Sequence, residues 1–102
     1  MTTWPYDRAR YRKMRWHAQY DLSPEDVNIM LHAQDEKCAI CGRNISDGSF
    51  VIDHSHASGR VRGLLCSQDN IFIGLAREDT ATLNAAVQYL KIHREAEPNA
   101  AG

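Results

Sequence analysis

Apolar residues recur at helical spacing in the segment that follows Ser23. Val27, Met30 and Leu31 lie three or four positions apart or side by side, which predicts a helix with one face toward a core. Ser23 is typical of a helix N-cap, and the proline that follows it is favoured at the first helical position. We therefore expect an amphipathic helix to begin at residue 24.

A second pattern, between residues 49 and 65, is typical of strands. Residues 49–53 form a short β-branched and aromatic run, and residues 61–65 form a second apolar run. The glycine-bearing loop between them predicts a β-hairpin. We expect two more helices, one that starts after Cys66 and loses regularity near Gly74, and one from about residue 80 to residue 94. The apolar stripe of the last helix consists of Leu83, Ala86, Val87, Leu90 and His93. The predicted fold class is α+β.

The first 20 residues interleave aromatic and basic residues. They hold five basic side chains against one acid, Asp7, and the segment from Asp7 to Tyr20 is expected to be helical. Tyr11 and Arg15, four residues apart, would share one face. Such an arm suits contacts with nucleic-acid phosphates, and the alternative is a solvated helix pinned to the domain by its aromatic residues. The two interpretations are compatible. The basic residues are Arg8, Arg10, Arg12, Lys13 and Arg15.

Composition sets limits on the class of protein. The chain has 102 residues, of which 43% are hydrophobic and 25% charged, as is ordinary for one folded domain. No run approaches the ~18 apolar residues of a membrane span. The N-terminus lacks the apolar stretch of a secretory signal, so we expect an intracellular protein. We divide the chain into an arm at residues 1–20, a core domain at residues 21–95 and a disordered tail at residues 96–102.

Three cysteines and an aspartate lie in a pattern typical of a zinc site. Cys38 and Cys41 form a Cys-x-x-Cys pair, and Cys66-x-x-Asp69 follows after 24 residues. Tetrahedral zinc takes four ligands, and a Cys-x-x-Cys turn brings two sulfurs to one ion. We expect the three cysteines to bind zinc, with Asp69 as a fourth ligand that weakens the site. A metal-free vestigial knuckle and a Cys38–Cys41 disulfide are the alternatives.

A second group of polar side chains, Asp53, His54 and His56, ends the first predicted strand, and Asn70 follows in the next helix. Asp53 and Asn70 offer the oxygen ligands that Mg²⁺ prefers. His54 offers a base suited to removing a proton from water near neutral pH. Consecutive strand residues point to opposite faces, so Asp53 and His54 share a site only if the strand bends there. Scattered surface polar residues are the alternative.

Together these motifs resemble the recombination endonuclease VII branch of the HNH (ββα-metal) nucleases. The likeness rests on Cys38-Ala-Ile-Cys41-Gly42, on the stretch VIDHSHASGRVRGLLC and on Asn70 with Gly74, and it covers about residues 20–92. It implies a metal-dependent DNA endonuclease with a ββα-metal core, a zinc knuckle and flanking helices, often encoded by phages. The implied reaction is hydrolysis of a phosphodiester in duplex or branched DNA, leaving a 5′-phosphate and a 3′-hydroxyl. The implied location is the cytoplasm of a bacterial or phage-infected cell.

The resemblance also implies roles for particular positions. His54 matches the general base that activates the attacking water. Asp53 and Asn70 match the ligands of a catalytic divalent ion, Mg²⁺ or a similar cation. Cys38, Cys41 and Cys66 match three of four cysteines around a structural Zn²⁺, and Asp69 departs from the fourth. The expected phosphate and DNA contacts are His56, Arg60 and Arg62 at the hairpin and Arg8, Arg10, Arg12, Lys13 and Arg15 in the arm. For Arg62 a structural role is an equal alternative.

Two other functions fit the same residues. One is a non-catalytic zinc-knuckle module that binds DNA through the arm, with salt-sensitive affinity that is indifferent to Mg²⁺ and to His54. The other is a structural or protein-interaction domain, which leaves the basic residues at positions 8–15 without a role. The DNA substrate, and the choice between a monomer and a homodimer, stay open at this point.

Overall fold

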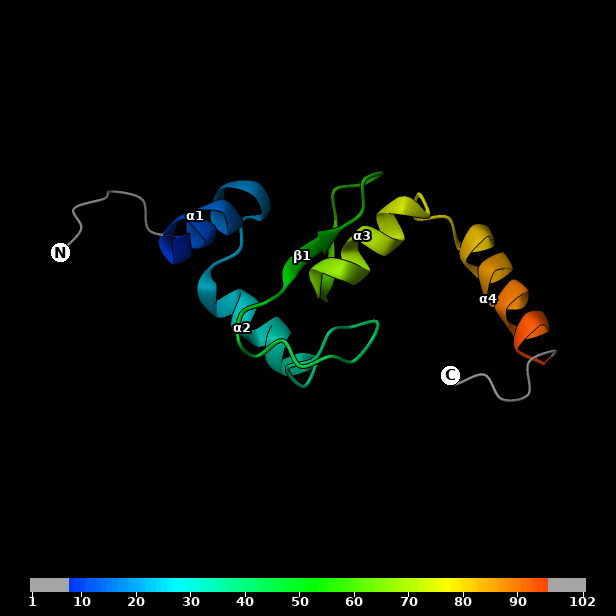
Figure 1. Ribbon diagram of the computed structural model, residues 1–102. Coiled ribbons are helices and arrows are strands. Elements are labelled where there is room, and N and C mark those ends of the chain that lie inside the picture. Colours follow the sequence, from blue (N-terminus) through cyan, green and yellow to red (C-terminus); the bar gives the residue numbers. More distant parts are fainter. Residues whose placement is uncertain (1–7, 96–102) are drawn as a thin grey trace. The chain divides into compact units, whose positions relative to one another are not determined.

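The computed structural model describes residues 8–95, without the side chains of the two end residues. Along the chain it has helices α1 (Arg8–Tyr20) and α2 (Pro24–Ala33), strands β1 (Val51–His54) and β2 (Val61–Leu65), and helices α3 (Ser67–Leu75) and α4 (Thr80–Glu95) (Figure 1). The predicted α+β class is confirmed. Contacts divide the chain into two compact units, one that ends at Asp69 and one that begins at Asn70. The tail predicted at residues 96–102 lies outside the described residues.

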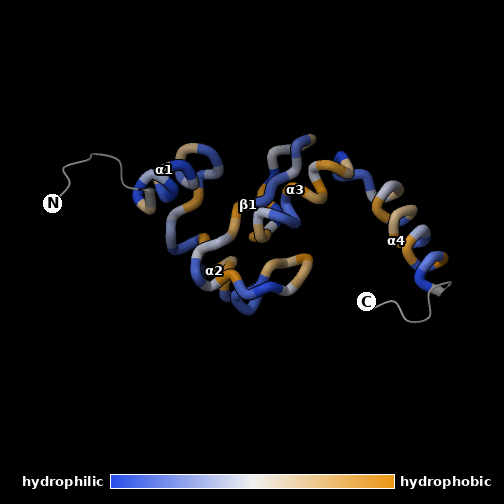
Figure 2. The backbone as a smooth tube through the Cα atoms, viewed as in Figure 1, coloured by the Kyte–Doolittle hydropathy of each residue, from blue (hydrophilic) through white to orange (hydrophobic). Residues whose placement is uncertain are grey.

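Helix α1 is largely hydrophilic, as Figure 2 shows, and has one half-buried face. Arg12, Trp16 and Tyr20 are half-buried and lie four residues apart, whereas the other described side chains from residue 9 to residue 19 are exposed. The helix ends at Asp21, which adopts a left-handed conformation with φ of 55°. The Asp21 N–H donates to the His17 carbonyl at 2.9 Å, which is the bond of an αL C-cap, and the Leu22 N–H donates to the Trp16 carbonyl at 3.2 Å. The inner face is therefore not the one that carries Tyr11.

Helix α2 forms as its sequence predicts. The Ser23 hydroxyl accepts a hydrogen bond from the Asp26 N–H at 3.1 Å, and the Asp26 carboxylate accepts one from the Ser23 N–H at 2.9 Å. This capping box satisfies two N–H groups at the helix start. Val27 and Leu31 are buried and Met30 is half-buried, so the predicted core face is confirmed.

The core of the first unit joins α2, the segment between residues 38 and 50, and the hairpin. Ile45 and Leu64 are fully buried, with 0% exposure. The other buried apolar side chains, leaving the cysteines aside, are Val27, Leu31, Phe50, Ile52 and Leu65. An isolated two-stranded sheet is only marginally stable in water, so the hairpin depends on this packing and on polar ties to its neighbours.

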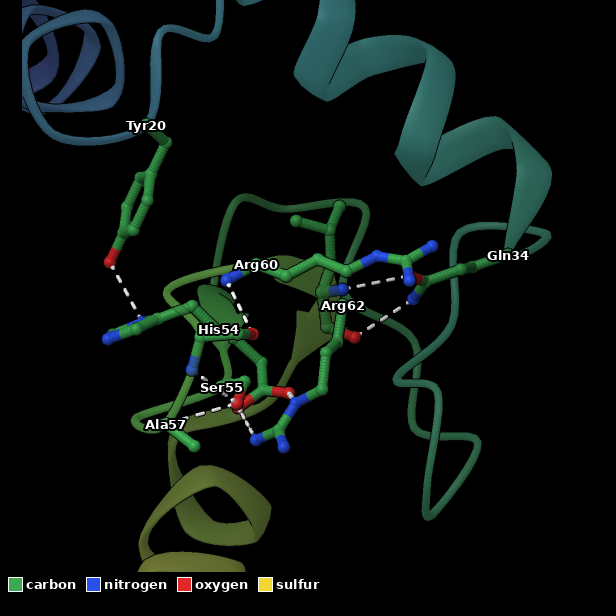
Figure 3. A network of polar contacts seen from close by, with 10 residues as sticks. Tyr20, Gln34, His54, Ser55, Ala57, Arg60 and Arg62 are labelled. Carbon is green, nitrogen blue, oxygen red and sulfur yellow. Dashed lines mark hydrogen bonds and ion pairs between the residues drawn. The ribbon is translucent and has the colours of Figure 1, made fainter.

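One such tie is Gln34, which caps the C-terminal end of α2. Its Nε2 donates to the Leu64 carbonyl at 2.9 Å, and its Oε1 accepts from the Leu64 N–H at 2.8 Å (Figure 3). The side chain thus pairs with β2 as the backbone of a neighbouring strand would. Gly63 makes this approach possible, because a Cβ at that position would lie 3.0 Å from the Gln34 Oε1.

The antiparallel hairpin contains an irregularity at the end where β1 runs into the connecting loop. Its register pairs Val51 with Leu65, Ile52 with Leu64, Asp53 with Gly63 and His54 with Val61. The register therefore shifts between Asp53 and His54. Such a β-bulge bends the strand and redirects side chains. The register shift falls at the position where a shared site for Asp53 and His54 would require the strand to bend, and that shared site stays a prediction.

The second unit contains most of α3 and all of α4. Asp79 caps α4 by accepting hydrogen bonds from the Thr82 N–H at 3.3 Å and from the Thr82 hydroxyl at 2.6 Å. Both helices occur where the sequence predicts them. Of the predicted apolar stripe, however, Leu83 is half-buried while Val87 and Leu90 are exposed. Periodicity identifies an apolar face but not whether another element covers it. No helix in the described part of the chain is long and apolar enough to cross a membrane.

Candidate functional site

Four potential metal ligands lie on either side of the hairpin in the sequence and meet in space. Cys38 and Cys41 precede β1, Cys66 follows β2 directly, and Asp69 lies in the first turn of α3. Their ligand atoms all lie within 4.8 Å of one another. The Cys38 N–H donates to the Arg43 carbonyl at 2.8 Å, which folds the intervening residues into a tight knuckle. This cluster can bind a metal ion.

The distances within the cluster fit a tetrahedral zinc site. The sulfur atoms of Cys41 and Cys66 are 3.9 Å apart. A tetrahedron with Zn–S bonds of ~2.3 Å has an edge of about 3.8 Å, whereas a disulfide bond is only ~2.05 Å long. The Cys38 sulfur lies 3.1 Å from the Asp69 Oδ2, and the three cysteines are free thiols. The donor set is therefore consistent with zinc.

Hydrogen bonds within the cluster shift its proton affinities in opposite directions. A hydrogen bond to Asp69 raises the pKa of Cys41 to about 11, while hydrogen bonds from the Cys41 and Cys38 thiols lower the pKa of Asp69. Burial raises the pKa of Cys38, but backbone N–H groups, the Cys66 N–H first among them, outweigh burial and leave it below the ordinary value. Asp69 is thus the hydrogen-bond acceptor for the Cys38 and Cys41 thiols, and backbone N–H groups stabilise the thiolate form of Cys38.

Asp53 is buried, with 7% exposure, at the bulge of the hairpin. Arg62 donates to both of its carboxylate oxygens, from Nε at 2.7 Å and from Nη2 at 2.9 Å. The Arg62 side chain is 38% exposed, so the pair extends from the interior to the surface. A carboxylate in this environment needs such a partner, because an unpaired buried charge is costly. Arg62 therefore supports the buried carboxylate, as its structural alternative expects, and its contact with DNA stays a prediction.

His54 is half-buried at the end of β1, where two aromatic rings contact it. Its Nδ1 lies 3.3 Å from the Tyr20 hydroxyl, and the two ring centroids are 5.4 Å apart. The ring of His56 meets it edge-on at a centroid distance of 5.1 Å. Figure 3 shows Tyr20 reaching from the end of α1 to His54. His54 thus directly follows the buried Asp53 in the chain and is contacted by Tyr20 of α1.

A family model for recombination endonuclease VII matches residues 13–92, which include the cysteine cluster, Asp53 and His54. The chain belongs to the recombination endonuclease VII family. Two relatives are each called Gene 59 protein, one from Mycobacterium phage D29, 37% identical over 76 residues, and one from Mycobacterium phage L5, 33% identical over 75. Each alignment covers 72% of this chain and 46% of the relative, so the chain spans less than half the length of these proteins. No solved structure matches the chain.

The region shared with the endonuclease VII family includes further residues of the predicted site. Asn70 lies within it, in α3, and it begins the second unit. Its partnership with Asp53 stays a prediction. Arg60 and His56 are exposed in the loop that joins the two strands. The Ser55 N–H donates to the Arg60 carbonyl at 2.9 Å and closes this loop (Figure 3). Both exposed residues therefore belong to a closed loop that begins directly after His54.

The basic arm divides its residues between two faces. Arg12 donates to the Gly48 carbonyl at 2.7 Å and to the Phe50 carbonyl, with its guanidinium 4.5 Å from the Phe50 ring centroid. Burial lowers the pKa of this guanidinium. The exposed face carries Arg10, Lys13 and Arg15. The helix is therefore anchored on one face and presents basic side chains on the other. The endonuclease VII match begins only at residue 13. The DNA contacts expected of the arm stay predictions.

Sequence reasoning missed two residues, Tyr20 and Gln34, which now join the site and its support. Tyr20 is 34 positions from His54, and Gln34 is 30 positions from Leu64. The four-residue spacing of Arg12, Trp16 and Tyr20 was an available signal for the face of α1 that packs inward. Nothing local to Gln34 distinguishes it from an exposed glutamine.

Proposed function

We propose that this member of the endonuclease VII family is a metal-dependent DNA endonuclease with an HNH (ββα-metal) site. The observation that carries the proposal is the adjacency of Asp53, a buried carboxylate, and His54, a half-buried imidazole, at a bulged hairpin end. A binding module has no need of a metal-ligating oxygen beside a base. The products would carry a 5′-phosphate and a 3′-hydroxyl.

In this proposal each residue has a separate task. His54 removes a proton from the water that attacks the scissile phosphate in line. Asp53 and Asn70 would hold a divalent cation such as Mg²⁺. When bound, this ion supplies charge that polarises the phosphate and stabilises the leaving 3′ oxygen. His56 and Arg60, both exposed, would contact the DNA backbone near the cut.

The chemistry of Asp53 is compatible with a cation ligand. An ionised carboxylate has about four acceptor positions, and Arg62 uses one on each oxygen. The remaining positions and the amide oxygen of Asn70 are hard oxygen donors of the type that Mg²⁺ prefers. Arg62 would then keep the carboxylate oriented, and a cation would share it.

We further propose that the Cys38, Cys41, Cys66 and Asp69 cluster holds a structural Zn²⁺. All four ligands belong to the first unit and lie on both sides of the hairpin in the sequence. An ion there would tie the two ends of the hairpin together without taking part in the chemistry. The carboxylate in place of a fourth thiolate makes the site a weaker one for zinc.

The test is nicking of supercoiled plasmid by the purified full chain with and without Mg²⁺ or Mn²⁺. We expect cleavage only with a divalent cation, and we expect it to collapse in a His54→Ala variant whose circular dichroism is unchanged. The matched control is His32→Ala, which removes an exposed histidine on α2. Equal cleavage by wild type and His54→Ala would refute the assignment. Linear duplex and a four-way junction, compared in the same assay, would identify the substrate.

A non-catalytic DNA-binding module is the second candidate, and the Arg62 pair favours it because both oxygens of Asp53 already have a cationic partner. In that case DNA binding would weaken steeply with salt and would be indifferent to Mg²⁺ and to His54. Gel-shift titrations of wild type and His54→Ala at two salt concentrations would separate the candidates. Binding without cleavage under every cation condition would favour the module.

A further inference from the structure

We propose that Tyr20 is a positioning residue that holds the imidazole of His54 in one orientation and one tautomer. This inference rests on the proposed function, because it gives Tyr20 a role in the action of the general base. It also makes α1 part of the scaffold of the site in addition to any role in binding DNA.

The contact itself is specific to one ring nitrogen. The Tyr20 hydroxyl lies 3.3 Å from the His54 Nδ1, and the rings are tilted by 48° at a centroid distance of 5.4 Å. A neutral imidazole carries its proton on one nitrogen and a lone pair on the other. A tyrosine hydroxyl can donate or accept, so the contact fixes the nitrogen that Tyr20 meets but not the direction of the hydrogen bond. In this proposal the Tyr20 oxygen accepts the Nδ1 proton, which leaves the lone pair of Nε2 to take a proton from water.

Tyr20 is held in place because α1 is anchored to the segment that directly precedes β1. Arg12 donates to the Gly48 and Phe50 carbonyls, and Trp16 stacks on the Phe50 ring at 6.2 Å with an interplanar angle of 16°. Residues four apart lie on one face of a helix. The face that contacts Phe50, just before β1, therefore continues to Tyr20, which reaches the last residue of the same strand.

The hydrogen bonds at the end of the helix fix the backbone conformation around Tyr20. It is the last residue of α1, and the turn after it is closed by the Asp21 N–H donating to the His17 carbonyl at 2.9 Å and by the Leu22 N–H donating to the Trp16 carbonyl. The backbone of Tyr20 thus lies inside a hydrogen-bonded cap. A side chain supported in this way can orient a second one, as a general base requires before substrate arrives.

The test compares Tyr20→Phe, which keeps the ring and removes the hydroxyl, with Tyr89→Phe. Tyr89 is a matched control because its ring lies 4.6 Å from that of His93 on α4, so the control removes a hydroxyl beside a histidine elsewhere. We expect kcat for plasmid nicking to fall about fivefold to tenfold in Tyr20→Phe, the effect of losing one hydrogen bond to a reacting group. We expect the KM of Tyr20→Phe to be unchanged, and we expect both kcat and KM of Tyr89→Phe to equal those of the wild type.

Nitrogen NMR gives a readout that a merely structural role would not move. At about pH 8.5, where imidazoles are neutral, long-range proton–nitrogen spectra distinguish the two tautomers, and His54→Ala identifies the signal. We expect His54 to hold one tautomer in the wild type and to become a mixture in Tyr20→Phe. His32, an exposed histidine, supplies the reference for a mixture.

Three results would overturn the inference. A mixture of tautomers in the wild type, unchanged nitrogen shifts in Tyr20→Phe, or an unchanged kcat in that variant would each mean that Tyr20 does not position the base. A wild-type protein that cuts no DNA with any cation would instead refute the proposed function, and the positioning role with it. The two failures are therefore distinguishable in one set of proteins.

Discussion

Replacing Arg62 by glutamine tests how far the fold depends on the pair between Arg62 and Asp53. The substitution leaves a carboxylate of 7% exposure without its guanidinium. Breaking a fully buried ion pair from one side costs about 3–5 kcal/mol. The Arg62 side chain is 38% exposed, so water already screens part of the interaction. We therefore expect a loss of about 2–3 kcal/mol, or roughly 10–20 °C in Tm for a domain of this size.

The assay is a double-mutant cycle on zinc-loaded protein at neutral pH. Denaturant unfolding followed by the fluorescence of Trp16, which stacks on Phe50, would be measured for Arg62→Gln, Asp53→Asn and the double variant. The loss of unfolding free energy in the double variant should be smaller, by about 2 kcal/mol, than the sum of the losses in the two single variants, since the double variant buries no lone charge. Arg60→Gln, an exposed arginine of the same hairpin loop, is the control and should change stability by less than about 0.5 kcal/mol.

The same variant also reports on the proposed cation site. Because a divalent ion can replace the missing positive charge, Mn²⁺ or Mg²⁺ should raise the Tm of Arg62→Gln more than that of the wild type. The double variant should not respond, since it lacks the carboxylate. A coupling energy below about 0.5 kcal/mol would refute the structural account of the pair. Equal Tm shifts in all three proteins would refute Asp53 as a cation ligand.

Three further predictions concern the support of the hairpin and the N-terminal cap of α2. Gln34→Ala should lower the free energy of unfolding by about 1–3 kcal/mol, because it leaves a buried Leu64 N–H without its acceptor. Gln19→Ala, at an exposed position of α1, should have almost no effect in the same denaturation experiment. Metal analysis should give about one zinc ion per chain, because the described residues contain a single four-ligand cluster. Asp69→Cys should slow the loss of zinc to a chelator. The hydrogen bonds from the Ser23 backbone and then its hydroxyl hold the pKa of Asp26 below its ordinary value. The stabilisation from Asp26 is therefore present above about pH 4 and is lost as pH falls through the lower folded value. An Asp26→Asn variant should show a shallower acid-unfolding curve.

The parts of the fold that depend on neighbouring residues were predictable from the sequence. The capping box of α2 requires only Ser23 and Asp26, and the cysteine knuckle requires only the spacing of Cys38 and Cys41. Both follow from the geometry of a single turn. The hairpin was predictable for the same reason, because two apolar runs flank a loop that contains glycine.

The contacts that complete the site were not predictable, because they join residues far apart in the chain. The bulge depends on which residues of two strands pair, and no residue type at positions 61–63 requires it. Arg62 has a chemistry suited equally to a phosphate and to a carboxylate, so its contact with Asp53 could be found only from the folded structure. The inner face of α1 was ambiguous, since Tyr11 with Arg15 and Trp16 with Tyr20 have the same spacing.

A metal ion in the cluster of Cys38, Cys41, Cys66 and Asp69 would link the stability of the fold to the proposed chemistry. Cys38 and Cys66 are 28 positions apart, and the intervening chain contains the whole hairpin with Asp53 and His54. In the chain-entropy model, a cross-link that closes a loop of this length stabilises the folded state by about 3–4 kcal/mol. A metal ion held by both ends of that loop acts as such a cross-link. Removing such an ion should loosen the strand that carries His54 and Asp53, so on the proposed function loss of zinc would reduce cleavage although zinc has no part in the proposed reaction.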